Sequence, residues 1–325
     1  MTPVTQILAT LRAAEHGVSS SDLCQKLNIS RAAVWSHIES LRETGFQIIA
    51  SPHRGYQLIS SPEQLVAEDL QSRLAGETII GRRIQTLQTT SSTNDEIEKA
   101  AQAGETEGLV VFAESQHQGR GRLGRKWSSP PGRGLWFSIL LRPALTANEC
   151  TQLTAAAAVS LVRAFRHTIG IRAGIKWPND IQIEGRKVAG ILTEMSAEID
   201  HVRHVILGIG IDVNQTTSDF TGELSTIATS LKLASGKTID RTRLAERILL
   251  ELDADYRRIL DRQFPTIAEE WAAHCTTIGK EITVDMGPRR VFGRAEALDE
   301  SGALLVRTQH GRMERVIGGD VTLAK

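Results

Sequence analysis

Nine consecutive residues, Gly119 to Trp127, place three glycines and four cationic side chains in one short segment, Gly-Arg-Gly-Arg-Leu-Gly-Arg-Lys-Trp. Glycine lets a backbone turn sharply and come close to a ligand. Arginine offers a planar, permanently charged fork that suits carboxylates and phosphates. The segment follows the apolar run 109–113, and we predict that it is a mobile loop that wraps an anion.

The spacing of Gly119, Gly121 and Gly124 also fits the G-x-G-x-x-G fingerprint of dinucleotide-binding proteins. That fingerprint requires a helix to begin directly after the glycines, so that the helix N-terminus faces the pyrophosphate. Here residues 128–132 read Ser-Ser-Pro-Pro-Gly, which does not begin a long helix. We therefore reject the dinucleotide interpretation, while a basic surface loop with turn glycines stays open as an alternative to an anion site.

A second group of polar residues lies at Lys176-Trp177-Pro178-Asn179-Asp180, between two strand-like segments. Proline breaks regular strand pairing, so a fixed bend is expected there. Lys187 then enters the apolar run 188–192, where a buried ammonium needs an anionic partner or a ligand. From these residues alone, Lys187 is equally well an edge lysine that discourages aggregation. For Asp180, the alternative is a residue that ends a turn.

Composition limits the classes of protein to which the chain can belong. It has 325 residues, enough for two or three domains, and its formal net charge is zero. No global basic field indicates nucleic acid or membrane, so any anion site must be local. The three cysteines form no C-x-x-C pair, which predicts reduced thiols and no thiolate zinc site. We see no signal peptide and no apolar run that could span a bilayer, and we expect a cytoplasmic protein with no membrane partner.

The first sixty residues predict a winged helix-turn-helix. Helical spacing covers residues 4–14, Ser20 or Ser21 is expected to cap a short second helix, Ser30 caps a third, and strands follow at 46–50 and 55–59. Such a module inserts its third helix into the major groove and touches the backbone with its hairpin. The residues that we expect to contact DNA are Ser30, Arg31, Trp35, His37, Arg42, His53 and Arg54.

The net positive charge of this module is small for a protein that binds DNA as a monomer. Residues 1–60 carry five Lys/Arg against four Asp/Glu, about one net positive charge. A dimer would double the phosphate contacts and fix the half-site spacing. The alternative is a helical interaction module that does not bind DNA.

The rest of the chain predicts an α+β architecture with a mixed sheet, since runs of strands alternate with segregated helices. Four or five short strands after residue 280, separated by turn residues, suggest a small SH3-like β-barrel. The expected domains are residues 1–62 (winged helix-turn-helix), 63–275 (catalytic domain) and 276–325 (barrel).

Taken together, these segments resemble the biotin protein ligase family, in the bifunctional form that doubles as the biotin operon repressor. The resemblance covers nearly the whole chain and rests on these pieces: Ser92-Thr93-Asn94, Gln116, Gly119–Trp127, Lys176–Asp180, Arg186–Leu192 and Gly208–Ile211. One departure is Asp212-Val213-Asn214, where the family usually has Asn-Val-Asn and the first asparagine lies near the nucleotide. A second is Leu123, where some relatives carry another arginine.

The resemblance implies a two-step reaction. The carboxylate of biotin attacks the α-phosphate of ATP, and a lysine of a biotin carboxyl carrier protein then attacks the biotinyl-5′-AMP. Catalysis by Lys187, Arg122 and Asp180 is implied, with Mg²⁺ as a companion of ATP and its ligands unassigned. The implied biotin contacts are Ser92, Thr93, Asn94, Gln116, Gly119, Arg120, Gly121, Arg122, Lys187, Gly190 and Gly208. The implied nucleotide contacts are Arg120, Arg122, Arg125, Lys126, Trp127, Lys176, Asn179, Lys187 and Asp212.

The resemblance also implies regulation. Ordering of residues 114–132 around the adenylate would let the strand near 193–196 pair with its twin, and the homodimer would bind the operator of biotin-synthesis genes. The carrier protein would use the same surface. Alternatives are a ligase whose N-terminal unit does not repress, a biotin-sensing transcription factor without catalysis, and a lipoate ligase of related fold.

Overall fold

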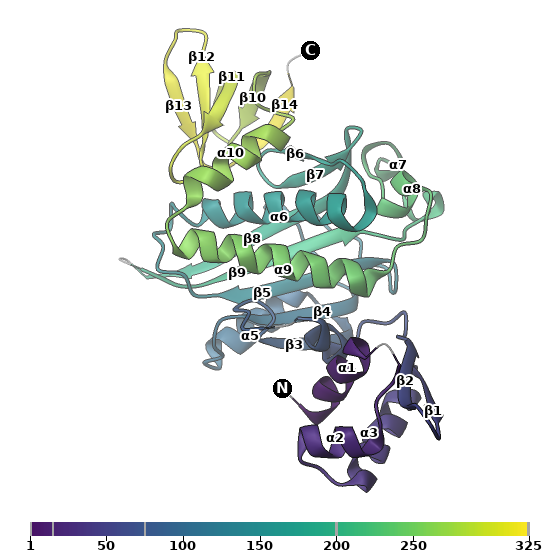
Figure 1. Cartoon of the computed structure of the whole chain (residues 1–325). Coiled ribbons are helices and arrows are strands. Elements are labelled where there is room, and N and C mark those ends of the chain that lie inside the picture. The colour runs from purple at the N-terminus through teal and green to yellow at the C-terminus, as the bar shows by residue number, and fades with distance from the viewer. Residues whose placement is uncertain (1, 15, 75, 199–200, 324–325) are drawn as a thin grey trace.

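The computed structural model describes residues 2–14, 16–74, 76–198 and 201–323. These residues form three units in a row, with the N-terminal helices at one end and a small antiparallel sheet at the other (Figure 1). A large sheet and its helices lie between them. The α+β class with a mixed central sheet is confirmed.

The N-terminal unit has the predicted order of three helices and a hairpin. Its elements are α1 (Pro3–Ala13), α2 (Ser20–Leu27), α3 (Arg31–Glu43), β1 (Gln47–Ser51) and β2 (Gly55–Ser60). The side chains of Thr2, Ser19 and Ser30 accept hydrogen bonds from backbone N–H groups of the first turns and so cap the three helices. The cap of α2 is therefore Ser19, and the expectation of Ser20 or Ser21 was wrong. A separate apolar core, which includes Ile7, Val34 and Ile38, holds this unit together.

The central sheet has seven strands in the order β3-β4-β5-β9-β8-β7-β6. Their bounds are β3 (Arg83–Thr90), β4 (Leu109–Gln116), β5 (Gly134–Leu141), β6 (Gly174–Lys176), β7 (Asp180–Ile183), β8 (Arg186–Ala197) and β9 (Val202–Asp212). Only β3 and β4 among these pairs run parallel, which makes the sheet mixed.

Helices cover both faces of this sheet, as the alternation of side chains along β4 shows. Val110 and Phe112 belong to the main core, whereas Leu109 and Val111 join the separate cluster around Ile97. The helix α5 (Thr93–Gln102) covers the second face, and α6 (Thr151–Ile169) and α9 (Arg241–Leu260) cover the first (Figure 1). The remaining helical elements are α4 (Ala67–Arg73), α7 (Leu224–Ile227), α8 (Leu231–Ser235), α10 (Phe264–His274) and the short 3₁₀ turns Arg122–Gly124 and Thr217–Asp219.

The C-terminal unit is a five-stranded antiparallel sheet in the order β13-β12-β11-β10-β14. Its strands are β10 (Glu281–Asp285), β11 (Arg290–Leu298), β12 (Leu304–Thr308), β13 (Met313–Val316) and β14 (Asp320–Leu323). The apolar side chains of Ile282, Val284 and Val306 are buried in the same core cluster as the central sheet. This unit therefore packs directly on the central one, which places β14 beside the central strands. None of the helices in the described part of the chain has both the length and the apolar character that a membrane crossing needs.

A buried ion pair fixes the linker after the N-terminal unit. Arg241 and Glu114 approach to 2.8 Å, and their side chains are 5% and 10% exposed. Glu114 also accepts the backbone N–H of Leu65, and Arg241 donates to the carbonyl of Glu63. One carboxylate at the end of β4 thus holds both the start of α9 and the linker.

We expect Glu114→Leu to lower the free energy of unfolding by about 3–5 kcal/mol, because it leaves the Arg241 guanidinium buried without its partner. Arg307→Ala, which removes one side of the exposed Arg307–Glu296 pair, should cost about 0–1 kcal/mol. Urea titration followed by tryptophan fluorescence compares the two, since four of the five tryptophans lie outside the N-terminal unit. Equal stability of the two variants would show that the buried pair contributes no more than a surface pair.

Candidate active site

A cavity of about 600 Å³ opens on the central unit between the glycine-arginine segment, the start of α5 and strands β7–β9. Most of the predicted ligand-binding residues line it: Ser92, Thr93, Asn94, Gln116, Arg120, Gly121, Arg122, Arg125, Lys126, Trp127, Lys176, Asn179, Asp180, Lys187, Gly190 and Gly208. Two predicted residues do not. Gly119 lies close to the Trp127 carbonyl, and Asp212 lines a smaller adjoining cavity.

Sequence reasoning missed several residues that complete this wall. They come from α7 and β14 and from positions next to the motifs: Gln182, Ile191, Leu192, Ile209, Gly210, Leu224, Thr226, Ile227, Asp320, Val321 and Thr322. Four of these positions could have been found, because they fall within the matched segments Arg186–Leu192 and Gly208–Ile211: Ile191, Leu192, Ile209 and Gly210. Nothing in the local sequence of α7 or β14 indicates a ligand.

The glycine-arginine segment is a closed hairpin rather than the open loop that its glycines suggested. The backbone N–H of Trp127 donates to the Gly119 carbonyl at 2.8 Å, and that of Gly121 donates to the Arg125 carbonyl at 2.7 Å. Leu123 at its tip adopts a left-handed conformation with φ 56°. Residues 114–116, which we expected in the mobile segment, belong to strand β4.

Two arginines of the hairpin are engaged by protein carboxylates. Arg120 donates to Glu194 on β8 at 2.9 and 3.0 Å and to Asp95 on α5 at 2.6 Å. The hydrogen bond to Glu194, followed by that to Asp95, raises the pKa of Arg120 above its usual value. Arg125 forms an ion pair with Asp320 on β14. These contacts tie the hairpin to three other elements, so Arg120 and Arg125 first serve to position it.

Arg122 and Lys187 occupy the floor of the cavity. The Arg122 guanidinium lies 3.4 Å from the Asn179 side-chain oxygen, and burial lowers the pKa of this guanidinium. The Lys187 ammonium lies 2.5 Å from an Asp180 carboxylate oxygen and 5.2 Å from the centre of the Trp127 ring. Opposite charges held at this distance in a half-buried site keep the ammonium oriented toward the cavity.

The Lys176–Asp180 motif makes the bend that Pro178 predicted, through a cis Trp177–Pro178 peptide bond. Asn179 then imitates a strand partner, because its carbonyl accepts the Ile191 N–H at 3.0 Å and its side-chain amide donates to the Ile191 carbonyl at 2.7 Å. Asp180 begins β7 directly opposite Gly190 on β8. The bend therefore brings Asn179, directly before β7, and Asp180, the first residue of β7, to the cavity.

The polar end of the cavity rests on a buried hydrogen-bond network. The Thr93 N–H donates to the Gln116 side-chain oxygen at 2.8 Å, and the Thr93 hydroxyl lies 2.7 Å from that of Ser138. Ser138 donates in turn to Asn94, whose amide donates to Glu194 at 2.6 Å. Ser138 is fully buried and was not predicted. The network fixes the orientation of the side chains that we expected to bind the head of a polar ligand.

The glycines of β8 and β9 make room for side chains that pack over the sheet. Gly190 and Gly210 face each other in register, and a Cβ on Gly210 would come within 2.6 Å of the Trp127 ring. A Cβ on Gly208 would collide with Asn94. Trp127 and Asn94 thus lie over these glycines, which also line the main cavity.

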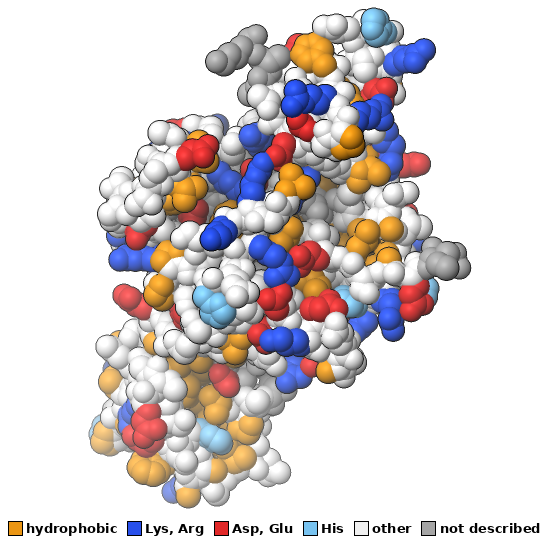
Figure 2. Space-filling model, turned by 180° about the vertical axis from the view of Figure 1, so that it is seen from behind, with side chains coloured by type: hydrophobic (Ala, Val, Ile, Leu, Met, Phe, Trp, Pro, Cys, Tyr) orange, Lys and Arg blue, Asp and Glu red, His pale blue; other side chains and the backbone are white. Residues whose placement is uncertain are grey.

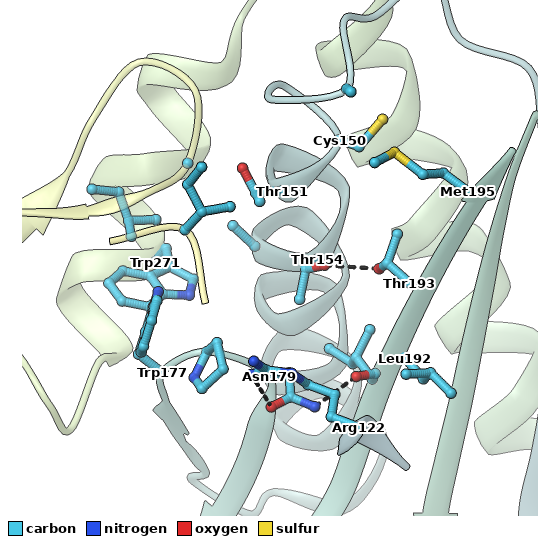
Figure 3. A pocket seen from close by; sticks show the side chains of 17 residues that line it. Arg122, Cys150, Thr151, Thr154, Trp177, Asn179, Leu192, Thr193, Met195 and Trp271 are labelled. Carbon is cyan, nitrogen blue, oxygen red and sulfur yellow. Dashed lines mark hydrogen bonds between the residues drawn. The ribbon is translucent and has the colours of Figure 1, made fainter. Parts of the chain in front are cut away.

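A second cavity of about 230 Å³ lies on the far side of Arg122 and Asn179, between α6, β8 and the C-terminal unit (Figure 3). Its walls include Trp177, Trp271 and Met195. The Thr154 and Thr193 hydroxyls meet across it at 2.8 Å. Along this cavity, residues 192–197 of β8 pair with β9 alone among the described strands, because β7 pairs only with residues 186–190.

Asp212 occupies a separate, smaller cavity of about 90 Å³ that adjoins the main one. Its carboxyl is 2.5 Å from the Gln215 amide nitrogen. Burial raises the pKa of Asp212 well above its usual range, and the Lys187 ammonium opposes this shift. Among the described residues, no group of three or more His, Cys, Asp or Glu side chains is arranged to hold a metal ion.

The predicted DNA-contacting residues divide into two sets. Arg31, Trp35, His53 and Arg54 are exposed on α3 and the β1–β2 turn, with Trp35 60% exposed. Arg42 donates to the Ile48 carbonyl at 2.7 and 2.9 Å and to Glu39, so it also joins α3 to β1. Ser30 caps α3, and His37 is half-buried. Acidic and basic side chains alternate over the face of the molecule in Figure 2.

This geometry limits the chemistry. One cavity joins a polar end of hydroxyl and amide groups to a floor of cations, which suits a ligand with a polar head and an anionic end. The side chains of Arg122 and Lys187 can neutralise two anions that would otherwise repel each other. A carboxylate beside the ammonium can hold or accept a proton from an incoming amine.

Comparisons with known proteins agree with this site and with the three units. Residues 86–212 match the Biotin/lipoate A/B protein ligase family, residues 4–57 an HTH domain, and residues 277–323 the Biotin protein ligase C terminal domain. The Bifunctional ligase/repressor BirA of Bacillus subtilis (strain 168) is 39% identical over 94% of this chain and 94% of its own length. That of Escherichia coli (strain K12) is 28% identical over 94% and 92%. The structure of biotin protein ligase from Aquifex aeolicus in complex with biotin and ATP superposes with a TM-score of 0.64 at 29% identity, covering 75% of this chain and 99% of that one.

Proposed function

Since this chain belongs to the family of bifunctional biotin ligase/repressors, we propose that it activates biotin with ATP in the cavity above Lys187 and passes it to a lysine of a biotin carboxyl carrier protein. Relatives named biotin–[acetyl-CoA-carboxylase] ligase support the enzymatic activity. The observation that carries the assignment of residues is the meeting of Arg122, Lys187 and Asp180 in one cavity beneath the hairpin.

In the first step, a biotin carboxylate oxygen bonds to the α-phosphorus of ATP, the bond to the β-phosphate oxygen breaks, and pyrophosphate leaves. Arg122 and Lys187 lie where they can hold the carboxylate and the α-phosphate together. Negative charge accumulates on the phosphate oxygens as the bond forms, and a fixed ammonium stabilises that charge. Positioning and electrostatics suffice, so no enzyme nucleophile is needed.

In the second step, the carrier amine attacks the carbonyl carbon of the mixed anhydride, and AMP leaves. The amine must shed a proton as its bond to carbon forms. Asp180 is the carboxylate at the cavity floor that can accept this proton or orient the amine. The cations Arg122 and Lys187 thus act in the first step, and the carboxylate of Asp180 acts in the second.

The remaining residues divide between the two substrates. Ser92, Thr93, Asn94 and Gln116 would contact the polar head of biotin, at the end of the cavity where the Thr93–Ser138 network lies. Trp127, Lys126, Lys176 and Asn179 would contact the nucleotide. Mg²⁺ would accompany the ATP phosphates, whose oxygens are the ligands it prefers.

The test is incubation of the purified chain with labelled biotin, ATP, Mg²⁺ and a carrier domain. One carrier lysine should become labelled, and bound biotinyl-5′-AMP should accumulate when the carrier is left out. Failure to form adenylate would end the ligase assignment. Lipoate offered in competition distinguishes a lipoate ligase, which the same family name also covers.

We propose in addition that the adenylate-bound chain forms a homodimer through residues 192–197 of β8 and then binds DNA. This edge is open to a further strand, and an open edge is a template for pairing with a second chain. Arg120 joins the hairpin over the cavity to Glu194 on this same edge. This ion pair connects ligand binding under the hairpin with the pairing of the strand edge. Two copies of the N-terminal unit would present Arg31 and Arg54 twice, which compensates for its weak charge.

Met195→Lys tests the dimer, because Met195 is 48% exposed on this edge and a charged side chain opposes edge pairing. We expect adenylate-dependent dimerisation to weaken by at least about tenfold, since two like charges would meet across the pair. Sedimentation with and without adenylate measures it. Met313→Lys, at an exposed methionine on strand β13, is the matched control.

A gel shift with DNA upstream of biotin-synthesis genes separates the bifunctional chain from a ligase that does not repress. The shift should require adenylate and should weaken in Met195→Lys. Dimerisation without any DNA shift would favour the second interpretation of the N-terminal unit. We further propose the boundaries 1–62, 63–275 and 276–325 for the three domains, and a cytoplasmic location, where ATP and carrier proteins meet.

A further inference from the structure

Glu194 on β8 accepts three hydrogen bonds, although it is not among the residues that line the main cavity. Its carboxylate takes the Nε and Nη2 groups of Arg120 at 3.0 and 2.9 Å and the side-chain amide of Asn94 at 2.6 Å. Arg120 belongs to the hairpin, and Asn94 to the first turn of α5. A carboxylate paired with a guanidinium offers acceptors only, so the direction of each of these hydrogen bonds is fixed.

The carboxylate of Glu194 thereby sets which way the Asn94 amide points. Only the N–H end of an amide can bond to a carboxylate, so the amide oxygen of Asn94 is turned the other way. That oxygen accepts the hydroxyl of Ser138 on β5. Gly208 on β9 leaves room for this arrangement, since a Cβ there would come within 2.3 Å of the Asn94 oxygen. The Ser138 hydroxyl is therefore the donor toward Asn94.

Ser138 passes the same direction on to Thr93. A hydroxyl has one hydrogen, and that of Ser138 is used on Asn94. The Thr93 hydroxyl oxygen lies 2.7 Å from that of Ser138, so the hydrogen between them belongs to Thr93. Ser138 is fully buried. Thr93, Ser138, Asn94 and Glu194 thus form a chain of hydrogen bonds, here called the relay, in which every donor points toward the carboxylate.

At the main cavity the relay ends in two acceptors. The hydrogen of the Thr93 hydroxyl is used on Ser138, so the Thr93 oxygen accepts any further bond. The side-chain oxygen of Gln116 lies 3.2 Å from it and accepts the Thr93 backbone N–H at 2.8 Å, while the Gln116 amide nitrogen donates to Ser129. Thr93 and Gln116 both line the main cavity. Two acceptors this close, without a hydrogen between them, favour a ligand that brings a donor.

We propose that Glu194 and Ser138 are positioning residues that determine which head group the cavity accepts. They hold Thr93 as an acceptor, and the cavity therefore selects a ring with an N–H donor, such as the cyclic urea of biotin. This inference rests on the proposed function and names the chemistry that the polar end recognises. A cyclic carbamate has the same ring with an oxygen in place of one N–H. Its ring oxygen would face the Thr93 oxygen with no hydrogen between them.

Glu194 also holds the hairpin through Arg120, and that second effect needs a control. Asp95 accepts the Nη1 group of the same guanidinium at 2.6 Å, but it lies outside the relay. Asp95→Asn and Glu194→Gln are the same chemical change, carboxylate to amide, at two partners of Arg120. If Glu194 acted only through the hairpin, the two variants would have equal effects.

The experiment is calorimetric titration of the full chain with biotin and with its two cyclic carbamate analogues, in which either ureido N–H is replaced by oxygen. ATP is left out, so that neither the adenylate nor the adenylate-dependent dimer forms. Wild type should bind at least one analogue about a hundredfold more weakly than biotin. The ratio of the two affinities is the quantity compared among variants, because a loss of stability lowers both affinities alike.

The preference for biotin over that analogue should fall by at least about tenfold in both relay variants. Ser138→Ala frees the Thr93 hydrogen to turn to the ring oxygen, and Glu194→Gln lets the Asn94 amide reverse, and the relay with it. Asp95→Asn should keep the preference within about threefold of wild type, since it removes one partner of a partly exposed ion pair. At saturating biotin, adenylate formation should keep its kcat in all three variants, because only binding of the head group changes.

An unchanged preference in either relay variant would overturn the proposal, and so would an equal loss in Asp95→Asn, which would assign the effect to the hairpin. Should Ser138→Ala fail to fold, Glu194→Gln, at a side chain that is 36% exposed, gives the same decision. Wild type that binds biotin and both carbamates equally refutes the selectivity but leaves the ligase function standing. Wild type that binds no biotin refutes the ligase function itself.

Discussion

Lys187→Ala should lower the rate of adenylate formation by about 10²–10³-fold with little change in the affinity for biotin, because the ammonium stabilises charge that appears only in the transition state. The ammonium is already oriented by Asp180 at 2.5 Å and lies over the Trp127 ring, so little reorganisation is needed as that charge develops. Biotin-dependent release of pyrophosphate, measured at saturating ATP, reports this step alone.

The matched control is Arg186→Ala, which removes the neighbouring cation on the same strand. Side chains alternate faces along a strand, and Arg186 does not line the cavity. Its rate should stay near that of wild type. A Lys187→Ala enzyme that turns over as fast as the Arg186→Ala enzyme would show that the cavity floor does not carry the charge stabilisation that we assign to it.

Asp180→Asn should slow transfer of biotin from preformed adenylate to the carrier by about 10²–10⁴-fold, because the amide cannot accept the proton of the attacking amine. Since Asp180 also orients Lys187, adenylate formation should fall as well, but by a smaller factor. Single-turnover experiments with purified adenylate separate the two steps. A small free amine at high concentration can replace the carrier. It tests whether the variant reacts slowly with any amine or is impaired only in docking of the carrier.

The role of Asp180 is decided by comparing its effects on the two half-reactions, adenylate formation and transfer to the carrier. Glu184→Gln, at the exposed turn between β7 and β8, keeps the hairpin while removing a nearby carboxylate and should leave both steps unchanged. If Asp180→Asn slows adenylate formation and transfer by the same factor, Asp180 acts only through Lys187 and has no separate role toward the amine.

Motifs that flank strands of one sheet were predictable as a single site. The glycine-arginine segment follows β4, and Lys176–Asp180 connects β6 to β7, so the sheet brings them to one cavity as their residue types suggested. Strand β3 was missed because its sequence, Arg-Ile-Gln-Thr-Leu-Gln-Thr-Thr, has few apolar residues and only Ile84 and Thr90 are buried. The pattern of apolar residues in β3 does not predict a strand, and it is the parallel pairing with β4 that makes this segment one.

The partners of cations could not be predicted from the same patterns. Arg120, Arg122 and Arg125 look equivalent in the sequence, yet Glu194 and Asp320 engage two of them from far along the chain. The sequence likewise places Arg42 on the polar side of its helix, and it does not show that the Ile48 carbonyl accepts a hydrogen bond from this side chain. Which charge is free and which is structural depends on contacts between residues distant in sequence, and spacing contains no information about those contacts.

The role of β14 in the cavity has a consequence for biosynthesis. Asp320, Val321 and Thr322 line the wall, and Asp320 holds Arg125 of the hairpin, although these residues are translated after all other parts of the site. A nascent chain that has already emerged as far as the central sheet therefore lacks one side of its substrate pocket. Competence to activate biotin should appear abruptly, when strand β14 has left the ribosome, rather than grow with the length of the polypeptide.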